Sequence, residues 1–346
     1  KEALPIAAGK KIALIGPFAD ARLDLLGSWY GQGQADKVVS ILTGLKERFG
    51  ADKVIYTKGS EPDKDDRSGF AAALNAARSA DKVVMAVGHP GFWSGEATSL
   101  TSIRIPAIQQ ELIREVAQSG KPLILVLLNG RPLDLSWEST VADAIVEAWY
   151  PGTEGGHAVA DVLSGDFNPC GKLTMTFPRN LGQVPIHYDA KNTGRPYTPG
   201  QGEQHYVSRY LNEPTATPLY PFGYGLSYTT FEYSDLKVAP EKTDMKQPVA
   251  VTVTVKNTGK VRGTEVVQLY VRDLVASVTR PTRQLKGFER VTLEPGESRE
   301  VSFTITSDAV GFYRQDMSFG YEPGDFKVWA GGSSDAALEG SFEITK

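Results

Sequence analysis

The sequence is poor in the residues that build disulfides, metal centres and membrane spans. Its single cysteine, Cys170, excludes an internal disulfide and a cysteine-based zinc site, although a lone thiol is compatible with an oxidising compartment. No apolar run approaches the roughly 18 residues of a membrane span, and the opening residues Lys1 to Ile6 contain no signal-peptide core. We therefore expect no membrane span, and we expect the sequence to be part of a longer polypeptide. The histidines lack metal-ligand spacing, so we expect no metal; they are His89, His157, His187 and His205.

Charge of one sign and nucleotide-binding motifs are also missing. The 37 basic and 41 acidic residues give a net charge of −4, and no Lys/Arg block is dense enough to follow a phosphate backbone, which argues against nucleic acid as a partner. The first apolar run ends in Gly16-Pro17-Phe18, which is neither a dinucleotide fingerprint nor a P-loop. Ser94 lies in G-x-x-S-G instead of the G-x-S-x-G of a nucleophile elbow. We expect no cofactor and no serine nucleophile.

What is present is a chain of 346 residues, 41% of them hydrophobic, which is long enough for two domains. Over residues 1–177, short apolar runs alternate with helical patterns, which is typical of an α/β sandwich with a mostly parallel sheet. Pro106, the apolar spacing of Ile108, Leu112, Ile113 and Val116, and Gly120 predict one helix between the third and fourth strands. The expected strands, each buried on both faces, are Lys11–Gly16, Val54–Tyr56, Val83–Val87, Leu123–Leu128 and Ala144–Ala148.

The remaining chain changes character twice. Residues 178–235 are rich in proline and aromatic residues, and such a composition predicts an extended connection pinned along other surfaces, with a structural role for Tyr220–Phe231. In residues 236–346 the apolar period becomes two, and turn signals separate short strands. This pattern predicts an immunoglobulin-like antiparallel sandwich. Its expected strands are Val249–Val255, Glu265–Val271, Gln284–Val291, Glu300–Ile305 and Phe326–Trp329.

The loop after the third expected strand is the first place to look for chemistry. Open parallel sheets bind ligands beyond the carboxyl ends of their strands, and this loop contains Phe92, Trp93 and Glu96. A carboxyl group beside apolar rings is a plausible general acid, because such surroundings penalise its ionised form. A glutamate in a glycine-rich loop is, however, more often a solvated surface residue. Arg131, near the next strand end, either forms a structural ion pair or faces the site.

Several motifs in one order resemble glycoside hydrolase family 3, especially its periplasmic bacterial β-glucosidases, and the similarity covers nearly the whole chain. They include Asn129-Gly130-Arg131-Pro132, Trp149 to Gly156, Gly165 to Leu173, Phe177-Pro178-Arg179, Tyr220 to Phe231, Gln284 to Glu289 and Glu294 to Glu297.

That resemblance implies a retaining, exo-acting β-glucosidase in which a (β/α)8 barrel, upstream of this chain, carries an Asp nucleophile. This chain is then the α/β sandwich followed by a fibronectin type III-like domain. The resemblance places the general acid/base at Glu96, and it suggests Phe92 and Trp93 as a wall for the leaving-group sugar, unless they only pack the loop. The substrate would be a β-glucoside or oligosaccharide, the partner the N-terminal barrel of the same enzyme, and the location periplasmic or secreted. We expect the isolated chain to be inactive.

Two positions depart from the family pattern, and a second class of function stays open. Leu100 stands where related sequences commonly carry Arg, and Cys170 stands where Ser is usual, which we interpret as a small buried residue. The alternative function is a non-catalytic carbohydrate-binding or scaffolding module. A nucleotide-binding domain is a third reading, and it lacks a phosphate loop.

Overall fold

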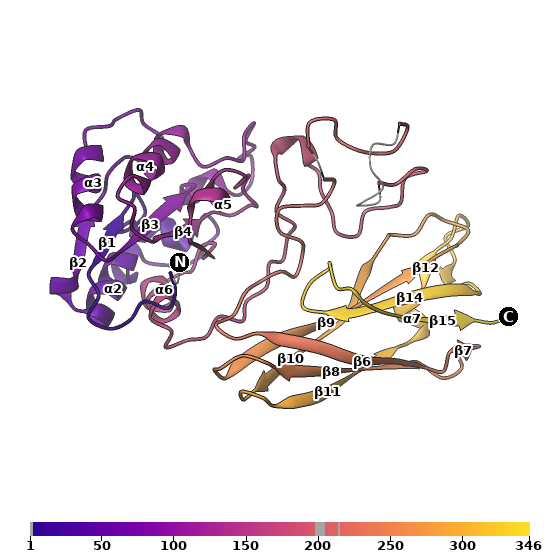
Figure 1. The fold of residues 1–346 in the computed structure, drawn as a ribbon. Helices are drawn as coiled ribbons and strands as arrows, with labels where there is room; N and C mark the ends of the chain where they lie inside the picture. Colours follow the sequence, from indigo (N-terminus) through magenta and orange to yellow (C-terminus); the bar gives the residue numbers. More distant parts are fainter. Residues whose placement is uncertain (1–2, 198–204, 214) are drawn as a thin grey trace. The chain divides into compact units, whose positions relative to one another are not determined.

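The computed structural model describes residues 3–197, 205–213 and 215–346, and these form two compact units (Figure 1). The first, called the α/β unit here, comprises Lys1–Phe167 and Pro178–Val184. The second, called the sandwich unit, comprises Asn168–Phe177 and Pro185–Lys346. Among the described residues, no helix has both the length and the apolar character needed to cross a membrane.

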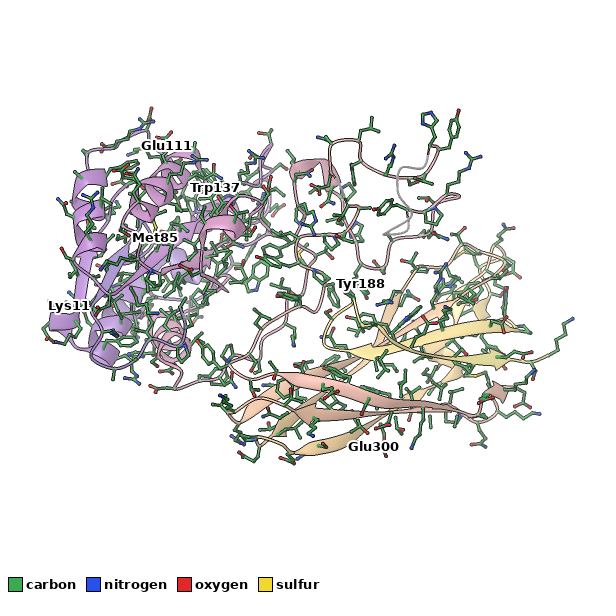
Figure 2. All side chains as sticks on the ribbon, viewed as in Figure 1. Lys11, Met85, Glu111, Trp137, Tyr188 and Glu300 are labelled. Carbon is green, nitrogen blue, oxygen red and sulfur yellow. The ribbon has the colours of Figure 1, made fainter. Side chains whose placement is uncertain are left out.

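The α/β unit is built on a five-stranded parallel sheet, as predicted. Its strand order is β2-β1-β3-β4-β5. Strands β1 and β4 are buried along their whole length and β3 from Val83 onward, and Met85 of β3 lies inside the unit (Figure 2). The expectation of burial on both faces is wrong for β2 and β5, because each is an edge strand and only partly covered. The strands are β1 (Ile12–Ile15), β2 (Val54–Thr57), β3 (Lys82–Gly88), β4 (Leu123–Leu128) and β5 (Ala144–Glu147).

Helices cover both faces of this sheet. Helices α2 and α6 pack on one face, where Leu45 and Leu163 join strand residues such as Leu14 and Val126 in one apolar cluster, and α3 and α4 cover the other. The helix predicted after Pro106 is confirmed as α4, with its buried face on Ile108, Leu112, Ile113 and Val116. The helices are α1 (Arg22–Leu26), α2 (Ile41–Phe49), α3 (Phe70–Arg78), α4 (Ala107–Ala117), α5 (Glu138–Val141) and α6 (Gly155–Ser164); short 3-10 turns are η1 (Ala35–Lys37), η2 (Ala51–Lys53), η3 (Gly91–Trp93) and η4 (Leu181–Gln183).

The strand order creates a crevice at one position. The chain goes from β1 outward to β2 and then returns to the other side of β1 to form β3. The connections leaving β1 and β3 therefore diverge from adjacent strand ends, and such a switch point is where open α/β sheets bind ligands.

The sandwich unit is a two-sheet antiparallel structure, as predicted, apart from the short parallel pair formed by β7 and β15. One sheet of the sandwich has the order β10-β9-β14-β15-β7 and the other β11-β8-β6, while β12 and β13 form a separate two-stranded pair. Alternate valines of β8 fill the core between the two sheets of the sandwich. The strands β6 and β15 were not predicted. The elements are β6 (Phe231–Ala239), β7 (Lys242–Thr243), β8 (Val249–Asn257), β9 (Gly263–Asp273), β10 (Gln284–Leu293), β11 (Ser298–Ile305), α7 (Ser307–Val310), β12 (Phe312–Tyr313), β13 (Phe319–Gly320), β14 (Gly324–Gly331) and β15 (Leu338–Ile344).

Aromatic rings hold part of the extended segment against the sandwich. Tyr188, labelled in Figure 2, stacks on Phe222 with ring centroids 4.2 Å apart, and its hydroxyl accepts a hydrogen bond from Leu285 N at 3.3 Å. Tyr188 also meets the buried ring of Tyr270 edge-on at 6.0 Å. Cys170 is only partly buried, contrary to expectation, and its sulfur accepts a hydrogen bond from the Arg290 guanidinium at 3.2 Å. Tyr188 and Phe222 thus attach this part of the segment to the sandwich unit.

Candidate active site

The candidate site begins where β3 ends. Gly88 has φ +136°, and a Cβ there would lie 2.1 Å from the carbonyl oxygen of Leu128, so only glycine fits this exit. His89 follows and is buried, with Nε2 2.9 Å from Arg104 O; burial lowers its pKa. Its ring packs on Trp93 with centroids 5.2 Å apart. His89 therefore anchors the start of the loop as a neutral packed side chain.

Glu96 lies on an exposed turn that follows η3. Gly95 on one side has φ +130° and Ala97 on the other has φ +58°, and the Thr98 hydroxyl donates to Gly95 O at 2.6 Å. The Glu96 side chain is open to solvent, so the apolar enclosure expected from the sequence is not provided by this chain. The turn presents the carboxyl group outward from the carboxyl edge of the sheet.

The two aromatic residues of the loop differ in their surroundings. Phe92 is 70% exposed and lines a pocket of about 460 Å³ together with Glu96. Trp93 is partly buried between His89 and Phe92, and it meets Phe92 edge-on at 6.5 Å. Phe92 is thus available to a ligand in the pocket, whereas Trp93 supports the loop from behind.

The opposite wall of this pocket comes from the connection after β1, which the sequence analysis did not single out. Trp29 is 76% exposed, and its Nε1 lies 2.9 Å from where a Cβ of Gly95 would stand, so the indole is adjacent to the Glu96 turn. Tyr30 and Leu23 complete the wall. The available signal was an aromatic pair inside the glycine-rich run Gly27 to Gly33, next to the strand that neighbours β3.

Polar contacts tie the two walls together. Gly91 N donates to Asp24 Oδ1 at 2.8 Å, and the Ser28 hydroxyl contacts the carbonyl oxygens of Gly91 and Ser94. Burial raises the pKa of Asp24, while the hydrogen bond from Gly91 lowers it. The first half of the loop is therefore fixed to the connection after β1.

Arg131 contacts the backbone of the loop and does not line the pocket beside Glu96, so its contacts match neither the ion pair nor the site-facing role considered from the sequence. Its Nη2 donates to the carbonyl oxygens of Trp93 at 2.6 Å and Thr98 at 3.1 Å. Its own carbonyl oxygen accepts from Asn129 Nδ2 at 2.9 Å, and the same amide reaches Glu147 Oε2 at 3.2 Å. Strand ends β4 and β5 thus contribute a polar network directly behind the Glu96 turn.

Glu147 is the carboxyl group of this network, and its pKa is strongly shifted. It ends β5, accepts a hydrogen bond from Trp149 N at 2.9 Å, and has its pKa raised by burial to about 8. Trp149 has φ +51°, which is unusual for a residue with a side chain, and the Glu147 contact holds it there.

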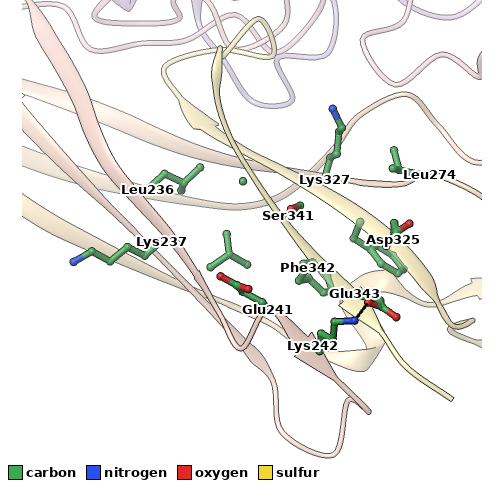
Figure 3. Close-up of a pocket in the computed structure, with 13 residues that line it drawn as sticks. Leu236, Lys237, Glu241, Lys242, Leu274, Asp325, Lys327, Ser341, Phe342 and Glu343 are labelled. Atoms are coloured by element: carbon green, nitrogen blue, oxygen red, sulfur yellow. Dashed lines mark ion pairs between the residues drawn. The ribbon is translucent and has the colours of Figure 1, made fainter.

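A larger groove, of about 780 Å³, lies on the sandwich unit between β6 and the β14–β15 pair (Figure 3). The aromatic rings that line it, Phe326 and Phe342, are both buried in the core. Its rim is charged, and Lys242 pairs with Glu343 at 2.6 Å. The groove therefore offers no ring face to a sugar, unlike the pocket beside Glu96.

The chain matches two family models. The model described as the glycosyl hydrolase family 3 C-terminal domain covers residues 1–228, and one described as a fibronectin type III-like domain covers residues 265–334. A periplasmic β-glucosidase of Salmonella typhimurium is 46% identical, over 99% of this chain and 47% of that protein. A β-xylosidase of Formosa agariphila is 42% identical, over 96% of this chain and 46% of that protein.

Solved structures give the same result. A β-glucosidase from Listeria innocua in complex with glucose superimposes with a TM-score of 0.94 at 40% identity, over 100% of this chain and 47% of that chain. The chain thus spans about half the length of the relatives it matches.

Proposed function

The chain belongs to glycosyl hydrolase family 3, and from this premise we propose that it is the C-terminal part of a retaining, exo-acting β-glucosidase. The Asp nucleophile and the (β/α)8 barrel that carries it lie in the half of the enzyme that this chain does not contain. The substrate is a β-glucoside or oligosaccharide, cleaved at its terminal β-D-glucosyl residue. By analogy with the Salmonella relative, the enzyme works in the periplasm or is secreted.

One observation carries the proposal: Glu96 is presented at the switch point of the sheet, beside the exposed rings of Phe92 and Trp29. A carboxylic acid there protonates the glycosidic oxygen as the anomeric C–O bond breaks, while the nucleophile forms the glycosyl-enzyme bond. The resulting carboxylate then takes a proton from water, which attacks the anomeric carbon and releases the nucleophile. In retaining enzymes the two carboxyl groups are about 5 to 5.5 Å apart, so the barrel must approach Glu96 closely.

The open position of Glu96 supports a site shared between two halves of an enzyme. A general acid must stay protonated near neutral pH, and enclosure by apolar surface is one way to achieve this. The barrel would supply that enclosure when it covers Phe92 and Trp29. The isolated chain is therefore expected to hydrolyse nothing, and measurable turnover of an aryl β-glucoside by this chain alone would refute this division.

The test replaces Glu96 in the enzyme that contains this chain and the barrel. Glu96→Gln should lower kcat/KM for cellobiose by about 10²- to 10⁴-fold, but much less for 2,4-dinitrophenyl β-glucoside, whose leaving group needs no proton. In Glu96→Ala, which leaves room for the anion, azide should rescue breakdown of the glycosyl-enzyme and give the β-glucosyl azide. Glu115→Gln on α4, a half-buried glutamate hydrogen-bonded to Gln118, is the matched control. Unchanged cellobiose hydrolysis by Glu96→Gln would remove Glu96 from the mechanism.

Because one relative is a β-xylosidase, the preference for glucose over xylose needs its own test. Comparing kcat/KM for matched aryl β-glucosides and β-xylosides tests the proposed preference for glucose, independently of the role of Glu96. Titration of the chain alone with cello-oligosaccharides tests the non-catalytic alternative. Tight binding without the barrel would favour a binding module, although the groove of the sandwich unit has no exposed ring to provide it.

A further inference from the structure

The turn that carries Glu96 is held at both ends by one side chain. It leaves the loop at Trp93 and returns at Thr98, and Arg131 Nη2 donates to the carbonyl oxygens of both residues, at 2.6 and 3.1 Å. Hydrogen bonds to a charged donor are about twice as strong as neutral ones. A single cationic group thereby fixes the distance between the two ends of the turn.

Arg131 is well placed to act as a fixed point. Its carbonyl oxygen is held by the fully buried Asn129, which also contacts Glu147 at the end of β5. Pro132 follows and restricts the backbone at this position. The guanidinium therefore projects from a rigid pair of strand ends, not from a free loop.

Within the turn, the Thr98 hydroxyl also donates to Gly95 O, whereas the contacts from the connection after β1 act only on the first half of the loop. Asp24 and Ser28 bind Gly91 and Ser94, before Glu96, whereas Arg131 also reaches Thr98, after it. Between these two contacts, the Ser94 side chain packs against Gly130, where a Cβ would lie 2.1 Å from Ser94 Oγ. The contact with Thr98 thus adds a constraint on the side of the turn that Asp24 and Ser28 do not reach.

We propose that Arg131 is a positioning residue that clamps the two ends of the 93–98 turn and so fixes where the Glu96 carboxyl group meets the leaving-group oxygen. This inference rests on the proposed role of Glu96. Arginine suits the task better than lysine, because its rigid fork directs its donors while an ammonium is a single flexible point. The contact partners are carbonyl oxygens, so the clamp works through the backbone and leaves the Glu96 side chain free to exchange protons.

The kinetic test uses the enzyme that contains this chain and the barrel. Arg131→Met keeps the apolar stem and removes the donors. It should lower kcat/KM for cellobiose by about 10- to 100-fold, as expected for a misplaced catalytic group, but lower it by less than about threefold for 2,4-dinitrophenyl β-glucoside. Arg131→Lys should restore part of the loss. Combining Arg131→Met with Glu96→Gln should cost no more than Glu96→Gln alone, because the clamp acts only through that carboxyl group. Arg48→Met, which removes an arginine paired with Asp166, is the matched control and should leave both substrates unaffected.

Hydrogen exchange provides a readout that does not depend on catalysis. Arg131→Met should speed amide exchange in the peptide covering residues 93–98 while the strands β3 and β4 keep their protection. Unchanged exchange in this peptide would overturn the proposed clamp. The clamp would also be overturned if Arg131→Met slowed both substrates equally while Glu96→Gln still slowed cellobiose much more than 2,4-dinitrophenyl β-glucoside. A Glu96→Gln defect that is equal on both substrates would instead overturn the proposed function, and this inference with it.

Discussion

Replacing Glu147 by glutamine should stabilise the α/β unit at alkaline pH, because the glutamate occupies a place that disfavours its charge. Burial raises its pKa from 4.5 to about 8, although Trp149 N and Asn129 Nδ2 donate to its oxygens. The folded state therefore holds a proton that the unfolded chain has released at neutral pH. Glutamine keeps the shape and an acceptor for Trp149, and its amide can donate to Asn129 Oδ1, a buried atom with no hydrogen-bond partner among the described residues.

The sign and size of the effect follow from proton linkage. A carboxyl group with a raised folded pKa contributes its full stability below the unfolded value of 4.5, and this is lost as the pH rises towards about 8. The whole difference corresponds to about 5 kcal/mol at ~1.4 kcal/mol per pH unit. Because the side chain retains some solvent access, we expect about half of this, ~2–3 kcal/mol, to be measurable.

Urea unfolding of the chain between pH 5 and 8.5 measures this pH-dependent difference in stability between Glu147→Gln and the parent. Tryptophan fluorescence reports mainly on the α/β unit, since four of the five tryptophans lie there: Trp29, Trp93, Trp137 and Trp149. The free energy of unfolding of Glu147→Gln relative to the parent should rise steadily with pH, while Glu115→Gln should show no such trend. A parent and Glu147→Gln that differ by the same amount at every pH would refute the reasoning.

Three further predictions concern stability and the Glu96 turn. Burial raises the pKa of Asp273 from 3.8 to about 6, so the stability that this residue contributes is complete below pH 3.8 and is lost as the pH rises through about 6. Asp273→Asn should therefore raise the free energy of unfolding in urea by about 1–2 kcal/mol at pH 7.5 but not at pH 4. Equal gains at the two pH values would contradict this. Hydrogen bonds to Glu47 and Glu154 raise the pKa of His157, so the stability that it contributes is present below pH 6.5 and is lost as the pH rises through the higher folded pKa. His157→Gln should lower the free energy of unfolding at pH 5.5 by less than about 1 kcal/mol, because the side chain is partly exposed, and should have no effect at pH 9; an equal loss at both pH values would contradict this. Gly130→Ala places a methyl group 2.1 Å from Ser94 Oγ and should displace the loop. It should reduce kcat of the complete enzyme about 10- to 100-fold with little change in melting temperature. Full activity would show that the loop can shift without moving the Glu96 carboxyl group out of place.

The central strands could be predicted from sequence because burial on two faces leaves continuous apolar runs, as in Leu123–Leu128. The strands β6 and β15 escaped prediction for the opposite reason. Each lies at or near the margin of its sheet, and charged residues such as Lys237 and Glu339 take the outward positions. In addition, an irregularity between Ser234 and Lys237 breaks the period of two in β6, and Gly340 interrupts the inward apolar residues of β15.

The candidate site was predicted only as far as one loop. Glu96 could be singled out because it follows a recognisable buried strand. Trp29 could not, because its proximity to Glu96 depends on β1 and β3 being neighbours, which no local pattern encodes. The role of Arg131 likewise depends on which carbonyl oxygens its guanidinium meets, and backbone acceptors leave no signature in the sequence.

The exposed Trp29, Phe92 and Leu23 also affect how the chain can be handled by itself. Apolar side chains gathered on one surface associate with one another, and sulfate or phosphate salts strengthen that association. A preparation of the lone chain will therefore keep its colloidal stability best when it is dilute and free of such salts, and precipitation by ammonium sulfate will select for aggregates formed through this face.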